Sequence, residues 1–393
     1  MRSAAIMMAA VLVAAGCAKS SAPHLEHVDL ARLQSRLEAS TTKAPGAVFG
    51  AVWRDGHRVL SAAGSADLRA RRPMTAETPF AWFSVTKLFT ATAILQLAEQ
   101  GRVDLDAPAD AYLPGMRLER DGHKASVRAL LSHTAGVANP QPEIITWIHL
   151  AGERGPTIDE MIARHLGPAP KLDFVPGSRT AYSNLGYVLL GKIIERVSGQ
   201  PYEDYVSGHV LAPLGCRASG FAVPADRATG YQRKWTFTNL MMQFLIDRRF
   251  VGGSIDGYQE LEPLTVDGIP HGGLNGPADC LLRFARMTME DGRGENGRVL
   301  AAQSVRAMLT PTRLNDGRTA TFGLAWRLGT IDGEPFADHT GGGGGYVSDL
   351  RVYPRLGYAV VVLGNETNYP AHELATLVIP NPDERVQADS STR

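Results

Sequence analysis

Runs of apolar residues near both ends of the chain predict β-strands. Residues 47–53 (Ala-Val-Phe-Gly-Ala-Val-Trp) and 57–60 flank Asp55-Gly56, which is a strong signal for a hairpin turn. Three further runs close to the C-terminus predict strands at 321–328, 346–353 and 358–363. A short helix from about Tyr369 to Val378 follows them. The N-terminal and C-terminal parts of the chain are therefore both predicted to be rich in β-strands.

The long section between these ends has the apolar spacing of helices. Predicted helices cover 87–100, 127–131, 158–165, 186–198, 202–210, 277–289 and 302–309, and an earlier one starts at Asp29. This order predicts an α+β fold, with an antiparallel sheet built from both chain ends, flanking helices and an inserted all-helical lobe. We expect one domain over residues 29–380, with an α/β lobe of about 29–83 and 290–380 and a helical lobe of about 84–289. A cleft between two lobes is a common place for a binding site.

The N-terminus predicts export. An apolar run from Ala4 to Ala15 is too short to span a bilayer and is typical of a signal peptide, here residues 1–17. Cys17, directly after Ala-Gly, resembles a bacterial lipoprotein cleavage site; plain secretion without lipid is the alternative. We expect a periplasmic protein or a membrane-anchored lipoprotein, with residues 18–28 as a tether and 381–393 as a flexible tail.

The amino-acid composition bears on which class of molecule the protein binds. The 393 residues are 44% hydrophobic and 20% charged, which is ordinary globular usage, and 40 basic residues balance 40 acidic ones. This balance argues against a nucleic-acid partner and leaves a small molecule or a peptide as the expected substrate. A His-Glu-x-x-His zinc motif and a Gly-x-Ser-x-Gly elbow are both absent from the sequence. We expect neither a metal nor a cofactor, and membrane contact only through a lipid on Cys17.

Two cysteines remain after Cys17. In an oxidising compartment Cys216 and Cys280 are able to form a disulfide, and the alternative is two separate buried thiols. The sequence leaves both open, because spacing along the chain does not place two Cα atoms within bonding range.

A serine three residues before a lysine occurs twice. Ser40 and Lys43 are followed by Ala-Pro-Gly, which cannot continue a helix, so this copy is interpreted as chance. Ser84 and Lys87 are followed by a strong helix that ends near Gly101. In the first turn, residues i and i+3 share a face, so the Lys87 amine reaches the Ser84 hydroxyl and a desolvated lysine activates it. The alternative is an N-capping serine beside a surface lysine.

Two later segments favour the catalytic interpretation of Ser84 and Lys87 over the structural one. Tyr182-Ser183-Asn184 directly precedes a predicted helix, and His339-Thr340-Gly341 ends a predicted strand and runs into four more glycines. Consecutive glycines at the start of a strand allow close approach of a ligand to the backbone. Alone, the first segment is also compatible with a packed tyrosine and the second with a flexible loop. Three such motifs, each in suitable local structure, favour one shared site.

Together these motifs resemble those of the serine β-lactamase and penicillin-binding-protein superfamily. The Tyr-x-Asn form is similar to its class C β-lactamase and D,D-peptidase branch, which also contains esterases and D-aminopeptidases. Residues 130–136 (Leu-Leu-Ser-His-Thr-Ala-Gly) resemble another recurrent segment of that branch, in which His133 is interpreted as structural rather than catalytic. The likeness extends from about Gly46 to Val378.

The resemblance implies roles for these residues. Ser84 is the nucleophile and Lys87 its activating partner, Tyr182 relays protons to the leaving group and to the deacylating water, and Asn184 holds the substrate amide. Whether Lys87 or Tyr182 is the working base stays open.

The third motif is implied to bind substrate. His339, Thr340 and Gly341 line the site, and the backbone N–H groups of Ser84 and Gly342 form the oxyanion hole, where donors act on charge that appears in the transition state.

Two departures from the family pattern bear on the substrate. Many β-lactamases have lysine at the position of His339, and class C enzymes place asparagine and arginine where this chain has Ala371 and Leu374. Both changes weaken the binding of a substrate carboxylate. We therefore expect an acyl-enzyme serine hydrolase acting on an ester, an amide, a D-amino-acid peptide or a β-lactam, with esterase or peptidase activity at least level with β-lactam hydrolysis. The alternative is a non-catalytic penicillin-binding or sensor protein that is acylated without turnover.

Overall fold

The computed structural model describes residues 30–42, 44–139, 147–236 and 246–376, with side chains from residue 34 onwards. The predicted signal peptide 1–17 with Cys17, the tether 18–28 and the tail 381–393 all lie outside the described residues. Within the described part of the chain, no helix combines the length and the apolar character that a membrane crossing needs.

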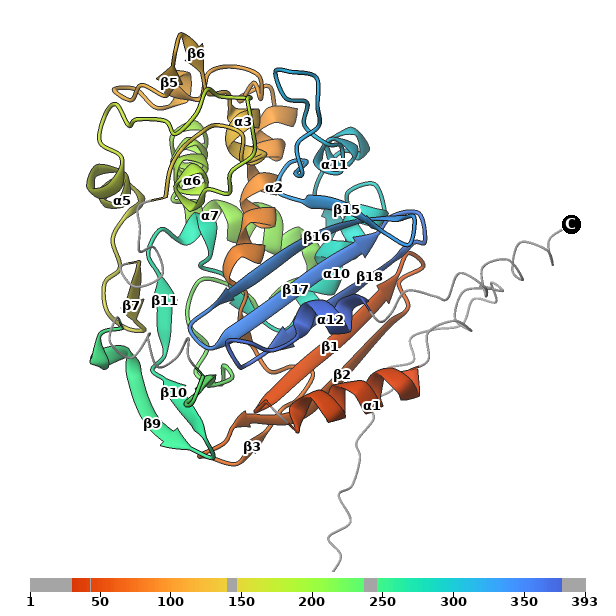
Figure 1. The fold of residues 1–393 in the computed structure, drawn as a ribbon. Helices are drawn as coiled ribbons and strands as arrows, with labels where there is room; N and C mark the ends of the chain where they lie inside the picture. The colour runs from red at the N-terminus through yellow and green to blue at the C-terminus, as the bar shows by residue number, and fades with distance from the viewer. Residues whose placement is uncertain (1–29, 43, 140–146, 237–245, 377–393) are drawn as a thin grey trace, which may run out of the picture. The chain divides into compact units, whose positions relative to one another are not determined.

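A seven-stranded antiparallel sheet forms the centre of the fold, with the strand order β15-β16-β17-β18-β1-β2-β3. Its strands are β1 (Gly46–Trp53), β2 (Arg58–Asp67), β3 (Arg72–Pro73), β15 (Arg327–Ile331), β16 (Glu334–Gly343), β17 (Tyr346–Tyr353) and β18 (Tyr358–Gly364). The first and last parts of the chain meet where β1 pairs with β18 (Figure 1). The predicted sheet built from both chain ends is therefore confirmed, as is the hairpin at Asp55-Gly56.

One predicted strand is wrong over most of its length. Residues 321–326 were expected to be extended as part of 321–328, but the strand begins only at Arg327. Ala325 has a φ of 71°, which breaks an extended path. Its backbone N–H donates to Leu131 O, and the N–H of Leu324 donates to Met308 O, so these groups serve neighbouring loops and helices instead of a strand ladder.

Helices cover both faces of the sheet. Helix α10 (Ala278–Met289) packs on β1 and β18, while α12 (Ala371–Thr376) packs on β17 and β18 from the other side, and α1 (Leu30–Thr41) lies in front of β1 and β2 in Figure 1. Every residue of β18 is buried because alternate side chains face opposite layers. Although the sequence-based division placed 277–289 in the helical lobe, α10 covers the sheet.

The insertion between the chain ends surrounds a central helix. Its helices are α2 (Thr86–Glu99), α3 (Val127–Leu131), α5 (Ile158–His165), α6 (Asn184–Ser198), α7 (Tyr202–Val206) and α8 (Ala212–Leu214), and α11 (Ala302–Met308) follows α10. Helix α2 is buried from Thr86 to Leu97, which explains why apolar residues occur on all of its sides. The predicted helix 202–210 is divided, because a π-helical turn (Ser207–Leu211) separates α7 from α8.

The insertion is not all-helical, which corrects that detail of the predicted fold class. It contains β5 (Glu119–Arg120), β6 (His123–Lys124), β7 (Ile148–Leu150), β8 (Gly230–Arg233), β9 (Val251–Ile255), β10 (Tyr258–Leu261), β11 (Leu264–Val266) and β12 (Asn275–Gly276), which pairs with β4 (Phe80–Ala81) just before the insertion. These strands have two to five residues and pair in sheets of two or three strands. Segments this short carry too few alternations for a period-two pattern to be recognised.

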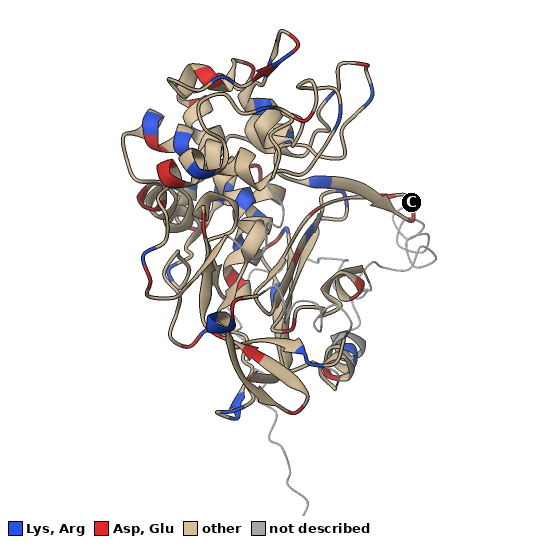
Figure 2. Ribbon diagram, turned by 60° about the vertical axis from the view of Figure 1, so that its left-hand side comes forward, with Lys and Arg blue, Asp and Glu red and all other residues tan. Residues whose placement is uncertain are grey.

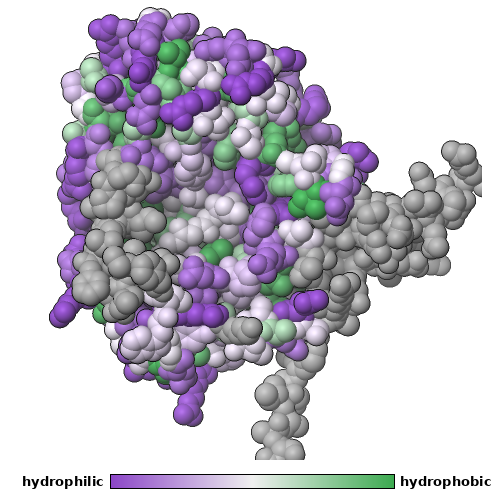
Figure 3. All heavy atoms as spheres, viewed as in Figure 1, coloured by the Kyte–Doolittle hydropathy of each residue, from purple (hydrophilic) through white to green (hydrophobic). Residues whose placement is uncertain are grey.

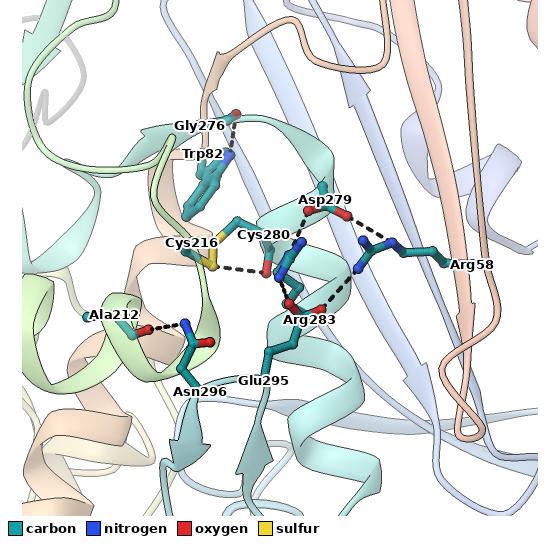
Figure 4. The surroundings of a disulfide bond; sticks show 10 residues. All are labelled: Arg58, Trp82, Ala212, Cys216, Gly276, Asp279, Cys280, Arg283, Glu295 and Asn296. Atoms are coloured by element: carbon teal, nitrogen blue, oxygen red, sulfur yellow. Dashed lines mark hydrogen bonds and ion pairs between the residues drawn. A yellow bond between two sulfur atoms is a disulfide. The ribbon is translucent and has the colours of Figure 1, made fainter. Parts of the chain in front are cut away.

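Basic and acidic residues are interspersed along the chain (Figure 2), and the face seen in Figure 1 is mainly polar, with apolar residues in separate patches (Figure 3). A disulfide joins Cys216, directly after α8, to Cys280 in α10, with the two Cα atoms 5.1 Å apart (Figure 4). Of the two states that the sequence left open for these cysteines, the cross-linked one is present. It connects the helical insertion to the helix that covers the sheet.

Candidate active site

Ser84 and Lys87 lie at the start of the central helix. Ser84 is in a 3₁₀ turn (Phe83–Val85) that leads into α2, and Lys87 is in the first turn of α2. The Lys87 Nζ atom lies 3.1 Å from Ser84 Oγ, and the lysine is fully buried while the serine is partly exposed. The structure thus brings the hydroxyl and the desolvated amine into the contact that the i, i+3 spacing predicted.

The turn before Ser84 is conformationally strained and held from several sides. Phe83 has a φ of 46°, which is unfavourable for a side chain of this size. The preceding Trp82 donates its indole N–H to Gly276 O at 2.9 Å, and its carbonyl accepts from Ser348 Oγ at 2.9 Å. These buried contacts tie the strained turn to β12 on one side and to β17 on the other. Sequence reasoning missed Ser348, because nothing in the sequence near it refers to a turn more than 250 residues away.

Lys87 has a second contact that the motifs did not reveal. Its Nζ lies 2.7 Å from the backbone carbonyl of His271, in a 3₁₀ turn (Ile269–His271). The preceding carbonyl, of Pro270, accepts from Thr90 Oγ1 at 2.7 Å, so one turn presents two successive acceptors to α2. The His271 ring closes this turn through a 2.8 Å contact between Nε2 and Asp267 O. A backbone carbonyl is available from almost any residue type, so sequence carries no signal for this partner.

The second motif lies over the buried lysine. The Tyr182 ring centroid is 4.8 Å from Lys87 Nζ, and Tyr182 itself is 40% exposed. Ser183 caps α6 by accepting a hydrogen bond from the Gly186 N–H at 2.9 Å, and Asn184 begins that helix. A phenol that faces both solvent and a buried amine is well placed to pass protons between them.

Residues 133–139 hold this motif in place. His133 Nδ1 accepts a hydrogen bond from the Ser183 N–H at 3.1 Å, and its ring centroid is 4.4 Å from that of Tyr182. Asn139 Oδ1 accepts from the Asn184 N–H at 2.8 Å, and its amide donates to Tyr182 O at 3.3 Å. These contacts support the structural interpretation of His133. Asn139 was not predicted, although its place just after the recurrent segment 130–136 was a usable signal.

The third motif forms an open edge of the sheet. Gly344 and Gly345 have φ values of 50° and 87°, as a two-residue type I′ hairpin turn requires, and Gly343 pairs with Tyr346 across it. Hydrogen-bonded pairs alternate along an antiparallel ladder, so the N–H of Gly342 points away from β17. Strand β15 does not cover this edge, because its pairing with β16 ends at Asp338.

The open edge touches the turn that carries Ser84. A Cβ atom on Gly341 would lie 2.2 Å from Trp82 O and 3.1 Å from Ser84 N, so only glycine permits this approach. Thr340 is exposed beside it, whereas His339 is buried. The structure therefore brings all three motifs together, with the Gly342 N–H on the uncovered side of β16.

The histidines of the site are neutral. Burial, followed by the nearby Lys87 charge, lowers the pKa of His339 to about 3 and the pKa of His133 well below its usual value. His339 Nδ1 lies 2.9 Å from Thr340 O, which requires the ring proton on Nδ1. Burial lowers the pKa of His271 to about 3 in the same way. Lys87 is thus surrounded by uncharged imidazoles.

One group of potential metal ligands is shared by β16, β17 and α12. The described residues contain a single such group: Asp338, Asp349 and His372. The Arg351 guanidinium already pairs with it, at 3.3 Å from Asp338, 3.5 Å from Asp349 and 2.8 Å from His372 Nδ1. Arg327 also pairs with Asp338, so two guanidiniums balance the two carboxylates. The group is therefore better suited to fixing β16 against β17 than to binding a metal ion.

Comparison with known proteins identifies relatives of this arrangement. A family model described as "Beta-lactamase" matches residues 32–379. The chain is 29% identical to penicillin-binding protein 4 of Amycolatopsis lactamdurans over 355 residues, which cover 86% of this chain and 85% of that protein. It is 37% identical to esterase EstB of Burkholderia gladioli over 224 residues, covering 52% of this chain but only about half (55%) of the esterase.

Solved structures of penicillin-binding-protein homologues and amidohydrolases are also similar to this chain. The octameric penicillin-binding protein homologue from Pyrococcus abyssi superposes with a TM-score of 0.69 at 27% identity, covering 88% of this chain and 76% of that one. A D-stereospecific amidohydrolase from Streptomyces superposes with a TM-score of 0.67 at 24% identity, covering 88% and 97%, and this likeness shows the fold alone.

Proposed function

This chain belongs to the Beta-lactamase family and is a serine hydrolase, and from that premise we propose that Ser84 forms an acyl-enzyme with uncharged ester or amide substrates. Three features support the role of Ser84: its contact with the buried Lys87 amine, the Tyr182 phenol above that amine and the uncovered Gly342 N–H beside it.

In the proposed reaction, Ser84 Oγ attacks the substrate carbonyl carbon while its proton passes to the Lys87 and Tyr182 pair. The N–H groups of Ser84 and Gly342 stabilise the negative charge that develops on the carbonyl oxygen. Tyr182 then donates a proton to the departing alcohol or amine, and Asn184 orients the acyl side chain. A water molecule that gives its proton to the same pair attacks the ester, releases the acid and restores Ser84.

The substrate preference rests on His339. The family commonly has a permanently charged lysine there, whereas this imidazole is buried and neutral, with a pKa lowered to about 3. The two positions where class C enzymes carry an amide and a cation are Ala371 and Leu374, which are both buried and apolar. A substrate carboxylate would lose water at this position without gaining an ion pair, so neutral acyl groups are favoured over penicillins and cephalosporins.

We further propose export through the signal peptide 1–17, with a lipid on Cys17, a periplasmic or membrane-anchored location, and the division into two lobes described above. The disulfide is consistent with an oxidising compartment. The proposed partner is a small-molecule or peptide substrate and not a nucleic acid. The mass of the N-terminal peptide of the mature protein tests lipidation, because a lipidated chain starts at a modified Cys17.

Three substrates test the activity: a short-chain aryl ester, a D-Ala-D-Ala peptide and a chromogenic cephalosporin. Ser84→Ala should lower turnover of the ester by a factor of about 10⁴ or more with little change in melting temperature. Ser40→Ala, at the other serine that precedes a lysine by three residues, is the matched control and should retain turnover. Ester hydrolysis that survives Ser84→Ala would contradict the mechanism. A stable mass adduct with a β-lactam, without turnover of any substrate, would favour the sensor alternative.

A further inference from the structure

A cavity of about 920 Å³ lies apart from the three motifs. It is bounded by the β1–β2 turn, the second half of α10 and a small hairpin of β13 (Arg293–Gly294) and β14 (Gly297–Arg298). Six arginines line it: Arg54, Arg58, Arg283, Arg286, Arg293 and Arg298. None of the predicted catalytic or substrate-binding residues does. We call this cavity the arginine cleft.

A closed network of charges forms one wall of the arginine cleft (Figure 4). Arg58 lies 3.2 Å from both Asp279 and Glu295, and Arg283 lies 2.6 Å from Asp279 and also pairs with Glu295. Each base therefore contacts both acids. Asp279 is next to Cys280, so the Cys216–Cys280 disulfide anchors this wall covalently. The wall is preorganised, but its own charges cancel.

The exposed side of the arginine cleft differs, because its bases are not paired with carboxylates. Arg54 donates to Pro354 O at 2.7 Å, and Arg298 donates to Asp291 O at 2.8 Å and Leu300 O at 3.1 Å. The Arg293 side chain has no hydrogen-bond or ion-pair partner among the residues that the structure describes. These three arginines are exposed and keep most of their N–H donors available.

The local charge is positive although the chain as a whole is balanced. The six arginines are opposed by Glu290, Asp291 and Glu295, with Asp279 behind them, which leaves two positive charges in excess. The carbonyl end of α10 adds only a partial negative charge. Guanidinium groups bind phosphate oxygens in a bidentate manner, and several of them are needed to hold more than one phosphate.

We propose that the arginine cleft binds a ligand that presents two or more closely spaced phosphate groups. The guanidiniums of Arg54, Arg293 and Arg298, which do not pair with a carboxylate, make the contacts, and the disulfide-anchored wall supports them. Such phosphates occur both in soluble chains and, closely spaced, on an anionic lipid surface. The site lies outside the catalytic machinery, so the proposal is independent of the substrate of Ser84.

Calorimetric titration of the full mature protein with sodium tripolyphosphate at low salt tests this proposal, with orthophosphate and phosphatidylglycerol vesicles as parallel arms. We expect tripolyphosphate to bind at least tenfold more tightly than orthophosphate, and added salt to weaken binding. The double variant Arg54→Gln/Arg293→Gln should reduce affinity at least tenfold. Arg154→Gln, which removes an exposed arginine paired with Glu160 elsewhere, is the matched control and should not change it.

The outcomes are distinct. Binding to tripolyphosphate that the double variant weakens supports a soluble phosphate chain as ligand, and binding only to vesicles with the same dependence supports a lipid surface. Absence of binding in both arms, or equal loss in the Arg154→Gln control, overturns the proposal. Arg293→Gln alone, which removes a side chain without a partner, keeps the test valid if the double variant folds poorly. Ester hydrolysis should be unchanged in all these variants, which separates this test from that of Ser84.

Discussion

The candidate active site and the arginine cleft differ in the number and the burial of their charged side chains. Around Ser84, Lys87 and three histidines are buried, the histidines are held neutral, and Lys87 is the basic side chain among them. In the arginine cleft, Arg58, Arg283 and Arg286 pair with partly exposed carboxylates, and the other three arginines are exposed without a carboxylate partner. Burial decides the difference, because removing an ion from water costs more than most single partners return.

This difference in burial suits the two regions to different functions, proton transfer in one and anion binding in the other. A desolvated site with one amine is suited to moving a proton, since its pKa values respond strongly to small changes. A wet and charge-rich cleft is suited to holding an anion, since its guanidiniums stay charged under all conditions. The two regions share one molecule but should respond differently to redox conditions, to pH and to a change of charge.

The largest expected effect comes from the disulfide that anchors the arginine cleft. Replacing Cys216 and Cys280 by alanine opens a loop of 64 residues, and chain-entropy reasoning predicts a loss of about 4 kcal/mol in the free energy of unfolding. Urea denaturation of the variant and of the reduced parent chain measures this loss. At a temperature where the variant is folded, phosphate affinity should fall more than ester hydrolysis. An unchanged stability in both samples would show that the cross-link does not constrain the fold.

The next effect concerns pH and the buried histidines. His271 and His339 have folded-state pKa values lowered to about 3, whereas an unfolded histidine titrates near 6.5. The unfolded chain therefore binds more protons below pH 6.5, so stability is complete above that pH and falls as the pH decreases towards 3. Each histidine should contribute a loss of about 2 kcal/mol between pH 7 and 5.

Comparison of unfolding free energies at pH 7 and 5 checks this effect. His339→Gln removes one titrating group and should reduce the pH dependence by about 2 kcal/mol, whereas replacement of His57, a surface residue on the β1–β2 turn, serves as the control. Burial raises the pKa of Asp338 and of Glu366, which acts in the opposite direction in acid. An identical pH dependence in the parent chain and His339→Gln would contradict the neutral state of this histidine.

The smallest effect comes from placing a cation in the neutral site. His339→Lys supplies the charge that many β-lactamases carry and should raise the ratio of cephalosporin to aryl-ester kcat/KM by about tenfold, which corresponds to one charge-assisted hydrogen bond. The melting temperature monitors any strain from the longer side chain. If the ratio of cephalosporin to aryl-ester kcat/KM stays constant in a folded variant, His339 does not determine the substrate preference.

Much of the fold was predictable because its signals are local. The Asp55-Gly56 turn, helix 158–165 and the strand 346–353 are each encoded by a run of neighbouring residues, and the structure has them at those positions. Residues 321–326 failed because their backbone partners lie in other elements. The short strands of the insertion failed because two to five residues are too few to show a period.

The residues of the candidate site also fall into those that local sequence predicts and those that it does not. Ser84, Lys87, Tyr182 and His339 were identifiable because a side-chain motif records chemistry at short spacing. The His271 carbonyl, Ser348 and Asn139 each make a contact in which one partner is a backbone group, with residues that are 43 to 266 positions away. The path of the chain brings these partners together, and the backbone groups that they contact leave no signal in the sequence.

The sequence by itself determined most of the longer elements, their order and the reactive groups, since these depend on local propensity and on spacing within one turn of helix. Only the tertiary structure decided that the two cysteines are bonded, that the histidines are neutral and that six distant arginines share one cleft. Bonding distance, desolvation and summed charge are properties of groups brought together through space, and no stretch of neighbouring residues contains them.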